Sequence, residues 1–87
     1  MNHFTLPRFW QHYRQLPIAV QHLADKNYLL LKADPFHPSL HFKRVGKNKQ
    51  LWSVRVGEHY RALGLPKGEG VVWFWIGTHS EYDKLLT

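Results

Sequence analysis

The chain has 87 residues, a formal net charge of +6 and no cysteine. This length predicts a single domain over residues 1–87, and the lack of cysteine excludes disulfide bonds and thiolate metal sites. The N-terminal segment lacks the apolar region of a signal peptide, and no apolar run approaches the roughly 20 residues that a membrane span needs. We therefore expect a soluble, cytoplasmic protein without membrane contacts.

The first part of the chain predicts two helices separated by a proline. Pro7 suits the first position of a helix, where its missing N–H costs nothing, and apolar residues follow it at helical spacing as far as Leu16. Pro17 ends this helix and can begin the next, which carries a broad apolar face from Ile18 to Leu31. The width of that face predicts that the second helix is extensively buried.

The second part of the chain predicts four strands and a short closing helix. Two prolines within residues 34–40 end the preceding helix and hold the chain extended. Segments with strand-like alternation, separated by glycine-containing turns, cover residues 39–45, 51–56, 59–65 and 71–77. Residues 78–86 then predict a helix capped by Thr78 or Ser80. This order predicts an α+β fold, with two N-terminal helices packed on a four-stranded antiparallel meander sheet.

The last strand, residues 71–77, is the most apolar of the four, and we predict that it lies at the centre of the sheet. Strict alternation assigns Phe74 and Ile76 to the face covered by the helices, and Trp73 and Trp75 to the opposite face. Two tryptophans beside basic residues would form an exposed apolar patch, which usually marks a binding surface. The alternative is that a loop or a terminus covers one of the two rings.

The positive charge is concentrated in the middle of the chain. Six of the twelve Lys and Arg residues lie in residues 41–61, which contain one acidic residue. Arg55 and Arg61 lie within predicted strands, where an unpaired guanidinium is unfavourable unless it faces water or an anion. Such a cluster predicts an anionic partner, which could be a nucleic acid, an acidic protein or a lipid surface. For the lysines, a solubilising surface is the alternative.

The C-terminal half of the chain resembles the RelE/ParE superfamily, the toxins of type II toxin–antitoxin systems. The shared pattern is a strand with a basic residue, a Tyr-Arg pair that opens the next strand, and an apolar strand that ends in Gly-x-His followed by a tyrosine. Its residues here are Arg55, Tyr60, Arg61, Gly77, His79 and Tyr82. The resemblance covers residues 7–86 in the order of elements and residues 45–86 in detail.

The resemblance implies a RelE-like fold, a cognate antitoxin partner and one of two activities. RelE-like and HigB-like members cleave mRNA, usually in the ribosomal A site, whereas ParE-like members inhibit DNA gyrase. We expect the first activity, a ribosome-dependent mRNA endoribonuclease. The alternatives are a gyrase inhibitor without catalytic activity and a degenerate module that only binds nucleic acid or an antitoxin.

RNA cleavage would need few protein groups, because the RNA supplies its own 2′-OH as nucleophile and no metal or other cofactor is required. Arg55 and Arg61 would hold the phosphate and stabilise its charge in the transition state. His79 would transfer protons, and Tyr82 would stack on a base or bond to the phosphate. The residues predicted to bind RNA are Lys43, Arg44, Lys47, Lys49, Trp73 and Trp75.

Each catalytic candidate also has a structural alternative. Arg61 could pair with Glu58 or Glu81 to hold the turn, and the ring of Tyr82 could simply pack on the sheet. His79 could cap the closing helix. The sequence shows no well-placed carboxylate to act as the base, so the identity of the general base stays open.

Overall fold

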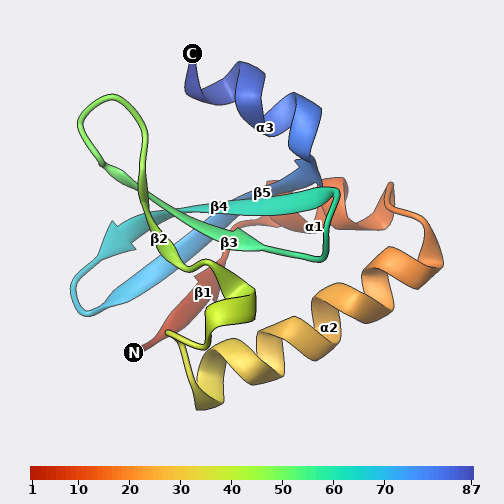
Figure 1. Ribbon diagram of the computed structural model, residues 1–87, viewed down its shortest axis with the longest axis horizontal. Helices are drawn as coiled ribbons and strands as arrows, with labels where there is room; N and C mark the ends of the chain where they lie inside the picture. The colour runs from red at the N-terminus through yellow and green to blue at the C-terminus, as the bar shows by residue number, and fades with distance from the viewer.

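The computed structural model describes residues 1–87 and has three α-helices and one five-stranded sheet (Figure 1). The elements in chain order are β1 (His3–Thr5), α1 (Pro7–Arg14), α2 (Ile18–Ala33), the 3₁₀ turn η1 (Pro38–Leu40), β2 (Lys43–Val45), β3 (Leu51–Arg55), β4 (Tyr60–Lys67), β5 (Gly70–Thr78) and α3 (His79–Leu86). The predicted α+β class is confirmed. No helix combines the length and the apolarity that crossing a membrane requires.

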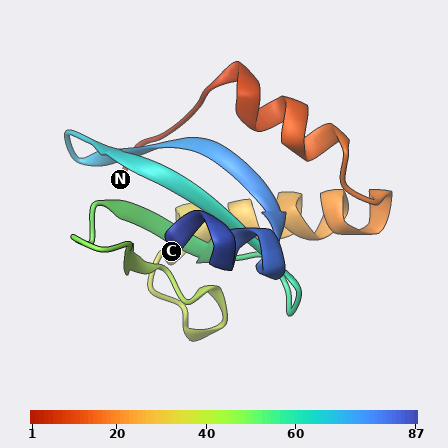
Figure 2. The ribbon, with the colours of Figure 1, turned by 90° about the horizontal axis from the view of Figure 1, so that it is seen from above.

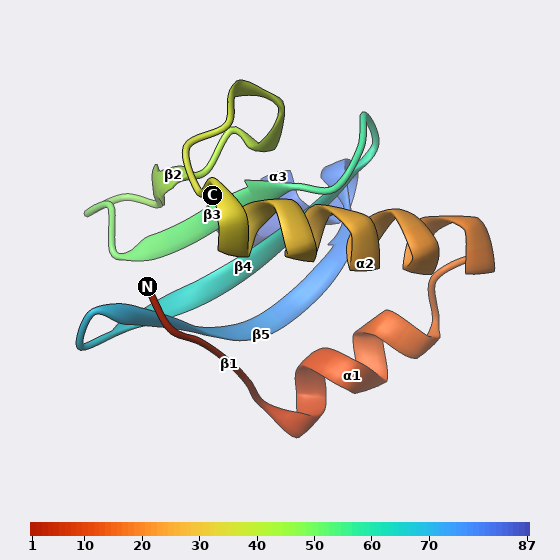
Figure 3. The same ribbon diagram turned by 90° about the horizontal axis from the view of Figure 1, so that it is seen from below.

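The sheet has the strand order β1-β5-β4-β3-β2. Strands β2 to β5 form the predicted antiparallel meander, and β1 adds a short parallel strand that pairs His3 with Val71 (Figure 3). The sequence did not predict β1. The prediction that residues 71–77 form the central strand is wrong, because β4 occupies the middle of the five strands and β5 lies between β4 and β1.

The two N-terminal helices begin where the prolines predict. Pro7 occupies the first turn of α1, and Pro17 directly precedes α2. The predicted burial of α2 is confirmed only in part. Leu31 is buried and Leu23 and Leu30 pack partly buried against the core, but Ile18 and Tyr28 are 63% and 42% exposed. The helix therefore keeps much of its apolar surface outside the core.

Two segments differ from the predicted strands because of local turn geometry. Pro38 opens a 3₁₀ turn and His41 takes a left-handed conformation with φ of 46°, so β2 begins only at Lys43 rather than at residue 39. At the other end of the sheet, β4 extends to Lys67 and β5 starts at Gly70. The predicted five-residue hairpin loop is therefore a tight turn.

The sheet buries a different set of side chains on each face. One face packs against α1 and α2, and Figure 1 shows α2 and α3 on opposite sides of the sheet. The other face packs against α3 and forms a small cluster of Leu63, Trp75 and Tyr82. The predicted alternation of β3 is confirmed, because Val54 lies in the first cluster while Ser53 bonds to Tyr82 of α3.

A β-bulge between β4 and β5 overturns part of the predicted alternation of the last strand: the predicted faces of Trp75 and Ile76 are confirmed, and that of Trp73 is wrong. Leu63 pairs with Trp75 and Gly64 pairs with Trp73, which leaves Phe74 as the extra residue. The extra residue shifts the alternation, so Trp73 enters the cluster under α1 and α2 while Trp75 enters the cluster under α3. Both indoles are buried. The predicted exposed patch with two tryptophans therefore does not exist.

His3 attaches β1 to the core through its side chain. Its Nδ1 accepts a hydrogen bond from Nε1 of Trp73 at 3.1 Å, and its Nε2 is buried without a partner. Burial lowers the pKa of His3 below its ordinary value of 6.5, and nearby positive charges, Lys32 among them, lower it further. The folded protein therefore holds this imidazole in its neutral form at a pH where the unfolded chain already binds a proton.

This difference predicts a pH-dependent stability. As the pH falls below 6.5, His3 becomes protonated in the unfolded chain but stays neutral in the folded protein. The free energy of unfolding should therefore decrease with falling pH until the pH reaches the lowered pKa of folded His3. The substitution His3→Gln should flatten that dependence. Urea unfolding at several pH values between about 7.5 and 5 would measure it. The matched substitution of the exposed His22→Gln should leave the wild-type slope, and an equal flattening by both substitutions would contradict the assignment.

Candidate functional site

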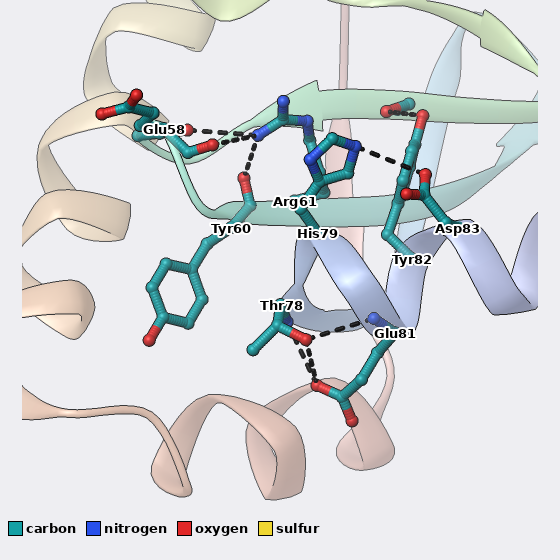
Figure 4. Close-up of polar contacts among 10 residues, drawn as sticks. Glu58, Tyr60, Arg61, Thr78, His79, Glu81, Tyr82 and Asp83 are labelled. Carbon is teal, nitrogen blue, oxygen red and sulfur yellow. Dashed lines mark hydrogen bonds and ion pairs between the residues drawn. The ribbon is translucent and has the colours of Figure 1, made fainter.

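Arg55 and Arg61 are direct neighbours across two strands. Arg55 ends β3 and Arg61 lies at the start of β4, and the register pairs them opposite each other. A tight turn joins the strands, and both side chains bond to it. Nε of Arg55 and Nη1 of Arg61 each donate to the carbonyl oxygen of Gly57 at 3.2 Å. Nη1 of Arg61 also donates to the carbonyl oxygens of Glu58 and Tyr60 (Figure 4).

Neither guanidinium has a carboxylate partner within the protein. The two ion pairs of the chain join His59 to Glu58 and His79 to Asp83. The alternative in which Arg61 holds the turn is confirmed, through its bonds to backbone carbonyl oxygens. The predicted pairing with the carboxylate of Glu58 or Glu81 is wrong. Like charges opposite each other in a sheet are destabilising by roughly 0.2–1 kcal/mol, so the pair has a cost that no internal anion offsets.

The bonds to the turn fix both guanidinium groups and still leave donors available. Arg55 uses only Nε, so its two terminal amino groups are free to contact an anion. Arg61 uses Nη1, so its Nε and Nη2 remain as a second edge with two donors. Planar edges of this kind match the spacing of two phosphate oxygens. The pair can therefore bind a phosphate without any rearrangement of the turn.

His79 is placed by the N-terminus of α3. The N-terminal cap of this helix is Thr78, which is one of the two capping residues that the sequence predicts. The hydroxyl of Thr78 accepts a hydrogen bond from the backbone N–H of Glu81, and the Glu81 carboxylate accepts one from the backbone N–H of Thr78. The backbone N–H and the hydroxyl of Thr78 both donate to the Glu81 carboxylate, and these two bonds lower the pKa of Glu81. The alternative in which His79 caps the helix is wrong.

The imidazole of His79 is accessible and has a carboxylate beside it. Its Nε2 lies 3.3 Å from Oδ1 of Asp83, one helical turn further on, and the side chain is 49% exposed. The backbone N–H of His79 donates to the carbonyl oxygen of His59 at 2.8 Å, which ties the start of α3 to the turn before β4. Figure 4 shows Arg61, His79 and Asp83 on the side of the sheet that carries α3.

Tyr82 lies in the interior, contrary to the predicted contact with RNA. The residue is 8% exposed and packs with Leu63 and Trp75. Its hydroxyl accepts a hydrogen bond from Oγ of the buried Ser53 at 2.9 Å. A ring enclosed in this way is not available to stack on a base or to bond to a phosphate. The alternative prediction, that the ring of Tyr82 packs on the sheet, is therefore confirmed.

The predicted basic residues divide between the two faces of the sheet. Lys43 pairs with Ser53 in the register and therefore lies on the same face as Arg55 and Arg61. Arg44 lies on the opposite face, where its guanidinium sits 4.8 Å from the centre of the Trp52 ring. Lys47 and Lys49 are exposed in the turn between β2 and β3.

The structure thus brings Arg55, Arg61, His79 and Lys43 to one face and excludes Arg44, Trp73, Trp75 and Tyr82 from it. These groups lie on an open surface, and neither of the two main cavities is lined by Arg55, Arg61 or His79. Sequence reasoning missed Asp83. Its spacing of four residues from His79 on a predicted helix was the signal that could have found it.

The hydrogen bond between Ser53 and Tyr82 allows a test of the structural role of Tyr82. Ser53→Ala and Tyr82→Phe each remove one of the two buried hydroxyl groups and leave the other without its hydrogen-bond partner. Each substitution should therefore lower the unfolding free energy by about 1–3 kcal/mol. The double variant should cost less than the sum of the two, because it removes both partners. Denaturant unfolding of the four proteins measures the coupling, and strictly additive costs would contradict a direct bond.

Comparisons with known proteins agree with this fold. Residues 19–84 match the family model of a ParE-like toxin domain. A copper-bound mutant toxin from Helicobacter pylori superposes with a TM-score of 0.63 over 93% of this chain and 97% of that chain, at 18% identity. A YoeB/ParE toxin from Agrobacterium tumefaciens superposes with a TM-score of 0.66 over 91% of this chain and 99% of that chain, at 14% identity. No curated protein sequence matches the chain significantly.

Proposed function

Since the chain belongs to the ParE-like toxin family of the RelE/ParE superfamily, and is thereby the toxin of a toxin–antitoxin pair, we propose that it is a metal-independent mRNA endoribonuclease that acts on the ribosome. The observation that carries this proposal is the pair of fixed guanidinium groups without a carboxylate partner, on the same face as the accessible His79. This combination supports binding of a phosphate together with a proton transfer beside it.

In the proposed reaction, the free edges of Arg55 and Arg61 hold two oxygens of the scissile phosphate. The 2′-OH attacks the phosphorus and the bond to the 5′ oxygen breaks, which leaves a 2′,3′-cyclic phosphate and a 5′-OH. Negative charge grows on the phosphate oxygens in the transition state, so fixed cations at this position lower the barrier more than they strengthen binding of the substrate.

The reaction moves one proton from the 2′-OH and one to the 5′ oxygen. We assign the second transfer to His79, acting as the general acid. Asp83 lies next to Nε2 and orients the ring, so Nδ1 is the nitrogen that would face the leaving oxygen. Water, or a group of the ribosome, accepts the proton of the 2′-OH. Lys43, Lys47 and Lys49 would add phosphate contacts along the RNA.

The test is the substitution His79→Gln, expressed in a sensitive bacterial host next to the wild type. We expect the wild type to arrest growth and to produce new RNA 5′ ends at specific codon positions. His79→Gln should lower the cleavage rate by roughly 10²-fold or more, because a general acid contributes about that much. His22→Gln replaces an exposed histidine of α2 and should cleave as the wild type does. Cleavage at an unchanged rate by His79→Gln would contradict the assignment.

Inhibition of DNA gyrase is the second candidate, and the burial of Tyr82 favours it, because this burial removes one of the predicted catalytic groups. A gyrase inhibitor needs the fold and a charged surface but no general acid. Induction would then cause DNA damage and filamentous growth while translation continues at first, with no new RNA ends. A degenerate binding module would give no growth phenotype at all.

A further inference from the structure

His59 and His79 lie opposite each other where the antiparallel ladder of β4 and β5 begins. The register pairs Tyr60 with Thr78. One residue further along, the backbone N–H of His79 donates to the carbonyl oxygen of His59 at 2.8 Å, which is the next hydrogen bond of the same ladder. Figure 2 shows the turn between β3 and β4, which contains His59, beside the start of α3. Side chains that oppose each other in this way have Cβ atoms roughly 5 Å apart on one face of the sheet.

The face that carries both imidazoles is also the face of the arginine pair. Side chains alternate along a strand, so positions 59, 61 and 63 share one side of the sheet. Leu63 packs in the cluster under α3, and Arg61 and His79 lie on that side as well (Figure 4). His59 is two positions from Arg61 along the chain and opposite His79 across the ladder. Both rings therefore border the phosphate that the arginines are proposed to hold.

The imidazole of His59 is available for a reaction. The side chain is 81% exposed, and its nearest ionic partner is Glu58, whose Oε2 lies 3.9 Å from Nε2. This separation is beyond the range of a hydrogen bond, so the ring can turn toward a substrate. The charged and titratable groups around His59 come from its own turn, β3, β4 and α3, and they are Glu58, Arg55, Arg61, His79 and Asp83.

We propose that His59 is the general base of the cleavage and takes the proton of the 2′-OH, in place of water or a group of the ribosome. The arginines cannot accept this proton, because guanidinium groups stay protonated at every working pH, whereas an imidazole exchanges a proton near neutrality. This inference rests on the proposed RNA cleavage. It divides the two proton transfers between two histidines that face each other across one ladder.

The reaction balances with these two imidazoles alone. Neutral His59 takes the proton of the 2′-OH, and the electron pair of that O–H bond forms the new bond from oxygen to phosphorus. The electron pair of the bond between phosphorus and the 5′ oxygen stays on that oxygen, which takes a proton from protonated His79. His59 then gives its proton to water and His79 regains one, so no other co-reactant is needed.

The first test is the pH dependence of cleavage of a defined mRNA on purified ribosomes at saturating toxin. The wild type should be fastest at an intermediate pH, because the base is protonated on the acid side and the acid has lost its proton on the alkaline side. His59→Gln should be slower by roughly 10²-fold or more, and it should lose the acid-side decline while keeping the alkaline one. An unchanged rate, or an acid-side decline that persists in His59→Gln, would overturn the proposal.

The second test uses an mRNA with sulfur in place of the 5′ oxygen at the cleaved bond. A thiolate leaves without being protonated, because thiols are far more acidic than alcohols. His79→Gln should therefore cleave this substrate within about tenfold of the wild-type rate, since the general acid is no longer needed. His59→Gln should stay slower by roughly 10²-fold, because the 2′-OH still has to lose its proton. Equal rates of the two variants on this substrate would overturn the division of roles.

Folding of His59→Gln should match the wild type, because the side chain is exposed and the carbonyl oxygen that holds His79 belongs to the backbone. The midpoint of urea unfolding checks this. Should the midpoint fall, the pH profile still decides, because an unfolded fraction lowers the rate without removing the acid-side decline alone.

Glu58→Gln is the matched control, since it changes the adjacent exposed residue and should cleave within a few-fold of the wild type. Loss of the acid-side decline in Glu58→Gln, and not in His59→Gln, would make Glu58 the base and overturn the proposal. Absence of RNA cleavage by the wild type would remove the proposed function and this inference together. Cleavage by the wild type with an equally active His59→Gln would overturn this inference alone.

Discussion

Replacing Arg55 or Arg61 with glutamine should reduce RNA cleavage by roughly 10²–10³-fold, the range measured when one preorganised donor to a transition-state oxyanion is removed. Both guanidinium groups are fixed against the carbonyl oxygen of Gly57 and are free of carboxylate partners. Glutamine is two atoms shorter than arginine, so its amide reaches only the position of Nε, and it has no charge to stabilise the phosphate. The cleavage rate of a defined mRNA on purified ribosomes measures the effect.

The stability of these variants separates a functional loss from unfolding. Arg55→Gln removes one of two like charges that lie opposite each other, so its unfolding free energy should stay within about 1 kcal/mol of the wild type. Arg44→Gln is the matched control, because Arg44 lies on the opposite face against Trp52 and should leave the cleavage rate within a few-fold. Comparable losses of activity in Arg44→Gln and Arg55→Gln would show that the overall charge matters and the pair does not.

The conservative substitution to lysine tests the geometry. Lysine keeps the positive charge but lacks the planar edge with two donors, so Arg61→Lys should recover part of the lost cleavage rate and not all of it. Full activity in Arg61→Lys would mean that only a diffuse positive field is needed, and the two-donor contact with phosphate would have to be abandoned.

Replacing Trp73 with alanine should cost about 3–5 kcal/mol of unfolding free energy, the usual range for a buried Trp→Ala substitution. Trp73 is 4% exposed, lies in the cluster under α1 and α2, and donates the hydrogen bond that holds His3 of β1. A domain of this size has a total stability of only about 5–15 kcal/mol, so this loss would remove a large share of it.

The measurement is urea or thermal unfolding followed by circular dichroism. Trp73→Phe keeps an aromatic ring but loses the hydrogen bond to His3, and it should fall between the wild type and Trp73→Ala. Phe36→Ala, at a side chain that is 68% exposed, should change the stability by less than about 0.5 kcal/mol. Similar unfolding midpoints for Trp73→Ala and Phe36→Ala would contradict the burial of Trp73.

The sequence alone determined the elements whose signals are local. Prolines at positions 7 and 17 set the starts of both N-terminal helices, because each ring is compatible with a helix start and not with a helix interior. Alternation in residues 51–55 assigned Ser53 and Val54 to opposite faces correctly. The placement of Arg55 and Arg61 in neighbouring strands followed from the short turn between them.

Tertiary structure decided the features that depend on distant partners. Strand β1 has only three residues and exists because it pairs with β5 almost 70 residues away, which no local pattern encodes. One unpaired residue, Phe74, reverses the faces of the strand after it and thereby sends Trp73 and Trp75 into different halves of the core. Composition and alternation cannot locate such a bulge, because it is set by how two strands fit over their neighbours.

The same limit applies to the candidate site. The residue types and their order pointed to Arg55, Arg61 and His79, but they could not tell a buried tyrosine from an exposed one. Tyr82 is enclosed because α3 lies over the sheet and Ser53 donates to its hydroxyl from a strand 29 residues earlier. The sequence states the chemical type of each side chain directly. The exposure of a side chain to solvent depends instead on which residues from distant parts of the chain pack over it.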